Sequence, residues 1–119
     1  MREISIVIPS YNEGASLHEL FERIDKVSNL YSLKIQLILV DDGSIDNTEE
    51  IVSNFKPKFI DSFFYIKLRR NSGKSEALSV GIQKVKYELV LTIDADLQDQ
   101  PEEIIKLLNK LDQGYDLVS

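Results

Sequence analysis

The feature that most constrains the fold of this chain is a regular alternation of short apolar runs with longer segments of helical periodicity. The apolar runs predict strands at 4–8, 34–40, 62–68 and 88–93, with a fifth strand beginning at 115. Helical spacing of apolar residues predicts helices at 15–28 and 46–54, after 73, and from 101 onward. The third helix is predicted to bury Leu78, Ile82 and Val85 on one face. Because strands and helices alternate strictly, the chain is predicted to be an α/β protein with a mostly parallel sheet between layers of helices.

Size and composition are those of a single globular domain spanning residues 1–119. An apolar fraction of 43% is ordinary for a folded protein and argues against disorder. The net charge of −6 argues against a nucleic-acid partner, since such proteins carry basic surfaces, and it is compatible with a site that attracts a metal ion. The absence of Cys excludes disulfides and thiolate metal ligands, and it is compatible with the cytosol.

Polar motifs follow the ends of the four complete predicted strands. They are PSYNE at 9–13, DDGS at 41–44, RRNSGK at 69–74 and DADLQD at 94–99. In open parallel sheets, ligands bind outside the carboxyl ends of the strands. We therefore expect at least some of these motifs to meet at one edge of the sheet and to form a ligand site there.

The acidic cluster after the fourth predicted strand is the part of this edge that most requires a positively charged partner. It comprises Asp94, Asp96, Gln98 and Asp99. Carboxylates this close repel one another, and their oxygens suit Mg²⁺ or Mn²⁺, which complete their coordination with phosphates and water. The Asp94–Asp96 pair is therefore interpreted as functional. Asp99 is interpreted as a helix cap, because Pro101 marks a helix start.

The other polar motifs each allow a structural and a functional interpretation. Of the two acids at 41–42, one is expected to fix the turn and the other to accept hydrogen bonds from a ligand base or ribose. Gly43 is expected to adopt a positive φ or to allow close approach of a ligand, and Asp46 to cap a helix. Arg70 and Lys74 flank a helix start and either contact the phosphate or base of a ligand or form a solvated basic loop.

Taken together, the motifs resemble those of inverting glycosyltransferases of family 2, which have the GT-A fold, a three-layer α/β/α architecture. The matching segments, in the family's order, are VIPSYNE at 7–13, LVDDGSIDNT at 39–48, RNSGKSEALSVG at 70–81 and TIDADLQDQPEEI at 92–104. The form DADLQDQPE is most similar to the branch that transfers sugars to polyprenyl phosphate, the dolichol-phosphate mannose synthase-like enzymes.

The resemblance also implies roles for individual residues. The positions that resemble the family's nucleotide-sugar-binding residues are Pro9, Tyr11, Glu13, Val40, Asp42, Asp94, Ala95 and Asp96. Within this set, Val40 and Asp42 are implied to contact the base or ribose. Asp96 and Gln98 resemble the ligands of a Mg²⁺ or Mn²⁺ ion, which together with the donor diphosphate would offset the repulsion within the acidic cluster. No residue of this chain is matched to a catalytic base.

The implied activity is transfer of a sugar from a UDP- or GDP-linked donor to polyprenyl phosphate or a growing glycan, as in cell-wall or glycan biosynthesis. Family members continue well past the position where this chain stops, and their later part carries the acceptor contacts. We therefore expect these 119 residues to bind the donor without transferring sugar, and to self-associate through the surfaces left uncovered. The expected location is the cytoplasm, or the cytoplasmic face of a membrane for a longer protein.

Two other functions use similar strand-end chemistry. A nucleotidyltransferase that makes nucleotide sugars would carry a glycine-rich basic loop after the first strand, where this chain has PSYNE. A receiver-type signalling module would place its acidic pair after the first strand, whereas the acids here follow the second and fourth strands.

Overall fold

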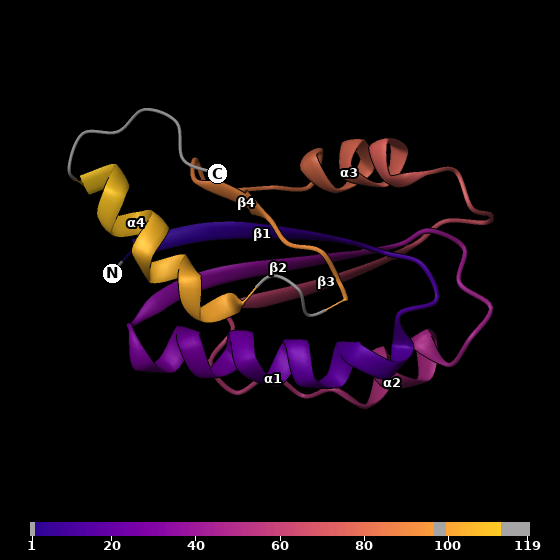
Figure 1. The fold of residues 1–119 in the computed structure, drawn as a ribbon, viewed down its shortest axis with the longest axis horizontal. Helices are drawn as coiled ribbons and strands as arrows, with labels where there is room; N and C mark the ends of the chain where they lie inside the picture. Colours follow the sequence, from indigo (N-terminus) through magenta and orange to yellow (C-terminus); the bar gives the residue numbers. More distant parts are fainter. Residues whose placement is uncertain (1, 97–99, 113–119) are drawn as a thin grey trace.

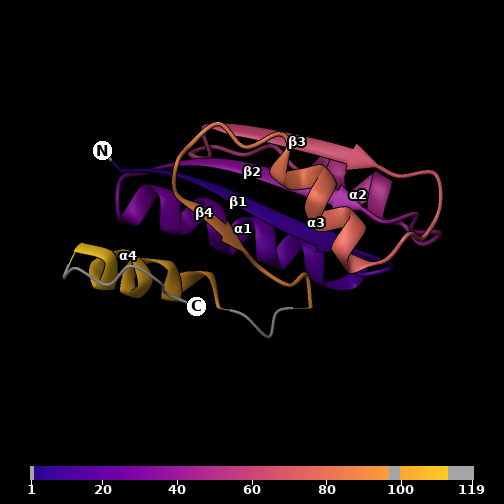
Figure 2. The same cartoon turned by 90° about the horizontal axis from the view of Figure 1, so that it is seen from above.

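The computed structural model describes residues 2–96 and 100–112 and confirms the predicted α/β architecture. Within these described residues, four parallel strands form one sheet in the order β3-β2-β1-β4: β1 Arg2–Ser10, β2 Leu33–Asp41, β3 Ser62–Lys67 and β4 Val90–Thr92. The helices are α1 Gly14–Leu30, α2 Thr48–Asn54, α3 Lys74–Ile82 and α4 Ile104–Asp112, the last preceded by the 3₁₀ turn η1 Pro101–Glu103. Helix α3 covers one face of the sheet, and α1, α2 and α4 cover the other (Figures 1 and 2).

The two central strands carry the core because both of their faces are covered by helices. β1 and β2 pair in register from Arg2 opposite Leu33 to Ser10 opposite Asp41. Successive side chains of a strand point to opposite faces, so the two apolar strands supply two separate clusters. The larger cluster lies on the side of α1, and the smaller one, centred on Val7, lies under α3.

Helix α1 forms where the sequence predicts it and buries the predicted stripe. The residues of this stripe, all at most 1% exposed, are Leu17, Leu20, Phe21, Ile24 and Val27. Phe21 packs against Phe55 and Phe63, with ring centroids 5.1 and 5.2 Å apart. These contacts join α1 to the segment after α2 and to β3, so the lower helix layer in Figure 1 packs directly on the sheet.

Helix α3 differs from its prediction. It ends at Ile82, whose side chain is 49% exposed, and it packs on the sheet through Ala77 and Gly81 instead. A Cβ atom at Gly81 would come within 2.5 Å of Val7 Cγ1, so only glycine permits this spacing between helix and sheet. The prediction was right for Leu78 and Val85, which are partly buried against the cluster that contains Val7, and wrong for Ile82, because Ala77 and Gly81 make the closest approach to the sheet.

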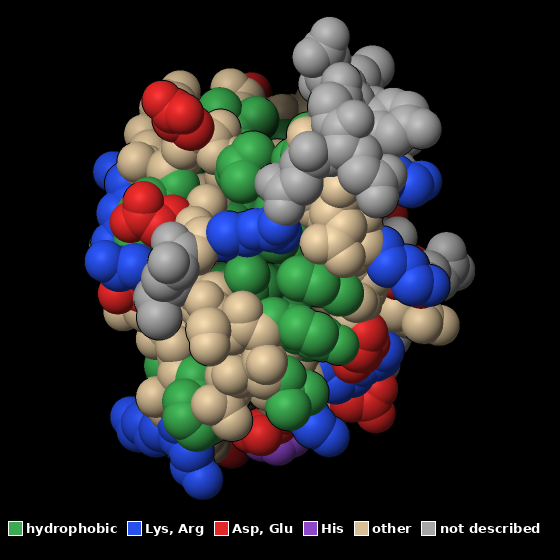
Figure 3. Space-filling view, turned by 90° about the vertical axis from the view of Figure 1, so that its left-hand side faces the viewer, with side chains coloured by type: hydrophobic (Ala, Val, Ile, Leu, Met, Phe, Trp, Pro, Cys, Tyr) green, Lys and Arg blue, Asp and Glu red, His purple; other side chains and the backbone are tan. Residues whose placement is uncertain are grey.

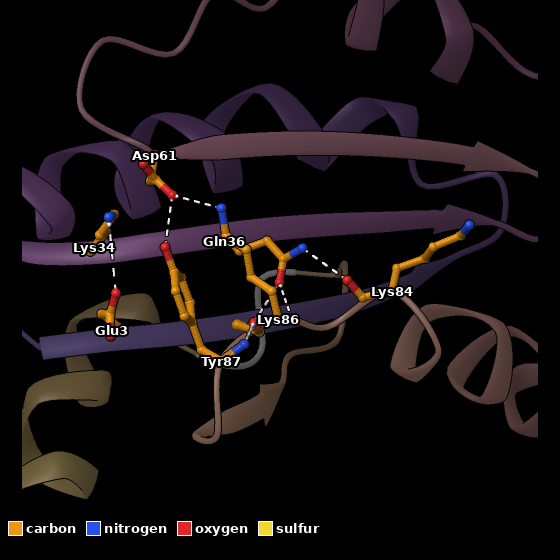
Figure 4. A network of polar contacts seen from close by, with 8 residues as sticks. Glu3, Lys34, Gln36, Asp61, Lys84, Lys86 and Tyr87 are labelled. Atoms are coloured by element: carbon orange, nitrogen blue, oxygen red, sulfur yellow. Dashed lines mark hydrogen bonds and ion pairs between the residues drawn. The ribbon is translucent and has the colours of Figure 1, made fainter.

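A polar network fixes the connection between α3 and β4 (Figure 4). Gln36 is buried on β2; its amide oxygen accepts hydrogen bonds from Ser5 Oγ at 2.5 Å and the Lys86 backbone N–H at 2.9 Å. Asp61 accepts a hydrogen bond from the Tyr87 hydroxyl at 2.9 Å and lies 3.1 Å from Lys86 Nζ. The hydrogen bond from Tyr87, and then the one from Lys86, hold the pKa of Asp61 below its ordinary value. This connection leads directly into β4, which pairs in parallel with β1.

The described residues test only some of the predictions made for the C-terminal part of the chain. The helix start near Pro101 is confirmed, as the turn η1 that leads into α4. The predicted fifth strand, from 115, and the predicted helix cap, Asp99, lie outside the described residues. Among the helices that the structure describes, none has both the length and the apolarity needed to cross a membrane. The end of the molecule at the amino ends of the strands carries acidic and basic side chains interspersed around hydrophobic ones (Figure 3).

Candidate functional site

A cavity of about 430 Å³ lies at the carboxyl edge of the sheet, beside the start of α3. Its lining comes from the end of β1, from the segments that follow the four described strands, and from the start of α3. The lining residues are Pro9, Ser10, Tyr11, Glu13, Asp42, Asn71, Gly73, Lys74, Ala77, Asp94, Ala95 and Asp96. The sequence-based expectation that strand-end motifs meet at one edge of the sheet therefore agrees with the geometry.

Most of the residues singled out from the sequence line this cavity, but three do not belong to its described wall. Val40 is fully buried beneath α3, in the cluster that contains Val7 and Ala77. Arg70 is exposed and is absent from the lining. Gln98, one of the two expected metal ligands, lies outside the described residues. The ligand-binding roles given to individual residues stay predictions.

Four lining residues were missed by the sequence-based assignment. Ser10, Asn71 and Gly73 lie inside motifs that were recognised as polar strand ends, so their neighbourhood was identified but their own contribution was not. Ala77 carries no polar signal and reaches the cavity because α3 lies so close to the sheet. The Ser10 hydroxyl is buried and has no hydrogen-bond partner among the described residues.

The two acids that end β2 have separate structural tasks. Asp41 accepts hydrogen bonds from the Ser44 backbone N–H at 2.8 Å and the Tyr65 hydroxyl at 2.6 Å, so it is the acid that fixes the turn. Burial and the hydrogen bond to Asp41 raise the pKa of Tyr65 well above its ordinary value. Asp42 faces the cavity instead and is 4% exposed.

Asp42 holds the loop between β3 and α3 in place. Its two carboxylate oxygens accept hydrogen bonds from the backbone N–H groups of Ser72 at 2.8 Å and Gly73 at 2.9 Å. Gly43 has a φ of +81°, as the sequence predicted, and a Cβ atom there would meet the Arg70 backbone carbon at 2.5 Å. The loop therefore rests directly on the turn after β2, and Asp42 links the two.

The loops after β1 and β2 are also cross-linked. The Asn12 backbone N–H donates to Ser44 Oγ at 2.8 Å, and the Asn12 side-chain oxygen accepts from the Ile45 N–H at 2.9 Å. Asp46 accepts from the backbone N–H of Gly14 at 2.9 Å and of Thr48 at 3.1 Å. Burial alone would raise the pKa of Asp46, but the hydrogen bonds from Thr48 and Gly14 outweigh it and lower that pKa.

Asp46 therefore differs in detail from the predicted cap. The N-cap position of α2 is Asn47, and it makes no side-chain capping bond. Asp46 binds the first residue of α2 and the first residue of α1 together, because the two helices begin side by side. Its carboxylate stabilises both helix starts, where backbone N–H groups lack partners within the helix.

An ion pair spans the cavity between α3 and the segment after β4. Lys74 Nζ lies 2.6 Å from Asp94 Oδ1, and the two side chains are 62% and 47% exposed. The neighbouring Ala95 carbonyl accepts a hydrogen bond from Ser16 Oγ at 2.5 Å, which ties the same segment to α1. The residues after β4 are thus held from both sides.

The charge of the lining is strongly asymmetric. Its carboxylates are Glu13, Asp42, Asp94 and Asp96, and among the described residues its one basic side chain is Lys74. Such a lining weakens the binding of an anionic ligand, and a cation that bound with the ligand would offset the repulsion. In the described part of the chain no group of three or more His, Cys, Asp or Glu residues is arranged to hold a metal by itself. Asp94 and Asp96 fit a cation such as Mg²⁺, which needs only one or two carboxylates when phosphates complete its coordination.

Comparison with known sequences identifies related proteins. The profile of Glycosyl transferase family 2 matches residues 5–119. Undecaprenyl-phosphate 4-deoxy-4-formamido-L-arabinose transferase of Pseudomonas savastanoi pv. phaseolicola is 41% identical over 115 residues, which cover 97% of this chain and 34% of that protein. The chain therefore spans about a third of the length of the curated relative it matches.

Solved structures share the fold. Residues 1–349 of S. aureus TarS, in complex with UDP, superpose with a TM-score of 0.77 at 24% identity, over 95% of this chain and 32% of that one. Glucosyl-3-phosphoglycerate synthase from Mycobacterium tuberculosis, in complex with Mn²⁺, UDP and glucosyl-3-phosphoglycerate, gives a TM-score of 0.68 at 27% identity, over 92% of this chain and 39% of that one.

Proposed function

Because this chain belongs to glycosyl transferase family 2, we propose that its cavity binds the nucleoside diphosphate of a sugar donor together with a divalent cation. The whole protein would then transfer the sugar to an acceptor with inversion at the anomeric carbon. Membership of a glycosyltransferase family also removes the reason to retain the two alternatives, a nucleotidyltransferase and a receiver module.

One observation carries the proposal, namely that the described lining of the cavity combines four carboxylates with a single ammonium group. A divalent cation suits the acidic side of this lining, and it would offset the repulsion that a nucleoside diphosphate alone meets there. The half-exposed Tyr11 ring at the edge of the cavity offers an aromatic face to a base. The cavity therefore offers complementary chemistry for both ends of the same ligand.

The residues proposed to hold the cation are Asp96 and Gln98. Asp96 lines the cavity two residues after Asp94, at a strand end held by hydrogen bonds on both sides. Hard oxygen ligands of this type fit Mg²⁺ or Mn²⁺ and not Zn²⁺. When bound, such an ion would supply Lewis-acid stabilisation of the charge that grows on the leaving diphosphate.

The transfer itself exchanges one bond for another at the anomeric carbon. The bond from that carbon to the diphosphate oxygen breaks and its electron pair leaves with the nucleoside diphosphate, while an acceptor oxygen forms the new bond from the opposite face. We propose polyprenyl phosphate as the acceptor, because the relative named above acts on undecaprenyl phosphate. A lipid phosphate is already anionic and requires no general base to attack. The proposed site of action is accordingly the surface of a membrane.

Calorimetric titration of the chain with UDP and with GDP, in EDTA and then in Mn²⁺, tests the donor site. We expect one of the two nucleotides to bind with a dissociation constant of about 0.1–1 mM, equivalent to about 4–5 kcal/mol. Asp96→Ala should weaken the Mn²⁺-dependent affinity by at least about tenfold, or about 1.4 kcal/mol. Glu22→Ala, which removes an exposed carboxylate from α1, is the matched control and should leave the affinity unchanged. Equal affinities for the parent and Asp96→Ala, with and without Mn²⁺, would place the metal elsewhere.

A further inference from the structure

The ion pair across the cavity points to a role for Lys74 beyond a contact with phosphate. Lys74 Nζ lies 2.6 Å from Asp94 Oδ1, and both residues line the cavity. We propose that Lys74 is a resident cation of the donor site. Its ammonium group pairs with Asp94 until a divalent cation binds, and it then moves to form an ion pair with the diphosphate of the nucleotide. This inference rests on the proposed function, because it concerns the same cavity and the same ligands.

The backbone at Lys74 is fixed while its side chain is mobile enough to exchange partners. Lys74 is the first residue of α3, and Asp42 holds the two residues before it through the N–H groups of Ser72 and Gly73. The Lys74 side chain is nevertheless 62% exposed, on a flexible four-carbon stem. Its ammonium group can therefore move from one partner to another within the cavity without moving the helix.

Electrostatics make the exchange favourable. A divalent cation bound near Asp94 weakens the ion pair between Asp94 and Lys74, because the two cations repel each other. An ion pair as exposed as this one contributes little to stability, so its loss opposes metal binding only weakly. Once released, the ammonium lies beside the N-terminal end of α3, where backbone N–H groups also favour an anion. The diphosphate is thus the natural second partner of Lys74.

The exchange predicts opposite effects on the two ligands when the Lys74 charge is removed. Without the ammonium, a positive charge that repels Mn²⁺ from the acidic side of the cavity is gone, so Mn²⁺ alone should bind more tightly. The nucleotide alone loses the one basic group in the described lining of the cavity and should bind less tightly. A purely structural role for Lys74 would weaken both ligands or neither, so opposite signs would show that the Lys74 charge acts on both ligands in this cavity.

The test compares Lys74→Met with two control variants. Lys74→Arg keeps the charge, and Lys34→Met removes an exposed lysine charge at the other end of β2, where Lys34 Nζ lies 3.9 Å from Glu3. Binding of MnCl₂ alone is followed by the electron paramagnetic resonance signal of free Mn²⁺. Binding of UDP and of GDP in EDTA is followed by calorimetry. Far-UV circular dichroism checks that each variant is folded.

Lys74→Met should raise the Mn²⁺ affinity by about two- to fivefold and lower the nucleotide affinity by a similar factor, the range expected for an exposed ion pair. Lys74→Arg should restore both affinities, and Lys34→Met should change neither. An unchanged or weaker Mn²⁺ affinity in Lys74→Met overturns the inference, as does an equal increase in Lys34→Met. A parent chain that binds neither UDP nor GDP refutes the proposed function and the inference together. A parent that binds a nucleotide with an affinity that Lys74→Met leaves unchanged refutes the inference alone.

Discussion

Asp42 is the residue whose replacement should most clearly separate a structural role in the cavity wall from a simple surface charge. It is 4% exposed, and each of its carboxylate oxygens accepts one backbone N–H, from Ser72 at 2.8 Å and from Gly73 at 2.9 Å. The substitution Asp42→Asn preserves size but leaves one oxygen and one NH₂ group. One backbone N–H would then face another donor at a partly buried position.

The expected cost follows from these two hydrogen bonds. Hydrogen bonds to a charged group contribute about 1.5–3 kcal/mol each, and an unsatisfied buried donor costs about 1–3 kcal/mol. Asp42→Asn keeps one bond in neutral form and loses the other, so we expect a loss of about 3 kcal/mol in the free energy of unfolding. A domain stabilised by about 5–15 kcal/mol remains folded after such a loss.

Urea unfolding followed by far-UV circular dichroism measures this loss. The matched control is Asp94→Asn, the same substitution at another cavity residue whose side chain is 47% exposed and pairs with Lys74. It should cost less than about 1 kcal/mol. Equal losses for the two variants would refute the assignment of Asp42 as the residue that holds the loop. Asp42→Asn should also weaken nucleoside diphosphate binding in EDTA, and a loss seen only with metal would show that its role was misassigned.

Three further predictions follow from the packing and the charges. Asp25→Ala should lower the free energy of unfolding, measured in urea, by about 3 kcal/mol. The Asp25 carboxylate is 7% exposed and accepts hydrogen bonds from the backbone N–H groups of residues 58–60, which lose this acceptor when it is removed. A loss below about 1 kcal/mol would contradict this. Gly81→Ala should lower the free energy of unfolding by about 1–3 kcal/mol and weaken nucleotide binding, because the added Cβ atom would push α3 away from Val7. An unchanged midpoint of urea unfolding would show that the helix position is not constrained there. The pKa of Asp46 is lowered in the folded state, so its contribution to the free energy of unfolding is fully present above its unfolded pKa of about 3.9 and is lost as the pH falls through the lower folded value. The stability difference between the parent and Asp46→Ala should therefore shrink below about pH 4. A difference that grows with acidity would contradict the assignment.

Much of this structure could be predicted from the sequence because the strongest signals are periodic and apolar. The stripe of α1 and the apolar runs of β1 and β2 specify which faces are buried, and alternation of the elements specifies a parallel sheet. In such a sheet the strand ends share an edge, so the motifs that contain Tyr11 and Asp94 were expected to meet.

The features that the sequence did not predict depend on close approach and on backbone contacts. Nothing in the pattern of α3 distinguishes Gly81 from the larger Ile82, yet the glycine is buried because the helix lies against Val7. The hydrogen bonds from Ser72 and Gly73 to Asp42 join segments that are about 30 residues apart and involve backbone groups without a sequence signal. Hydrogen-bond partners of this kind can be identified only from the three-dimensional positions of the loops.

The most direct test of the central claim is to map nucleotide binding onto the backbone amide signals by ¹⁵N nuclear magnetic resonance. With Mg²⁺ and UDP or GDP, the signals that shift most should be those of residues 10–13, 42 and 71–77, which surround the cavity. Replacing Mg²⁺ by Mn²⁺ in the same complex should broaden the signals of residues 94–96 before all others among the described residues. Shifts that cluster instead near the amino ends of the strands, or Mn²⁺ broadening away from 94–96, would contradict the placement of a donor nucleotide and its cation in this cavity.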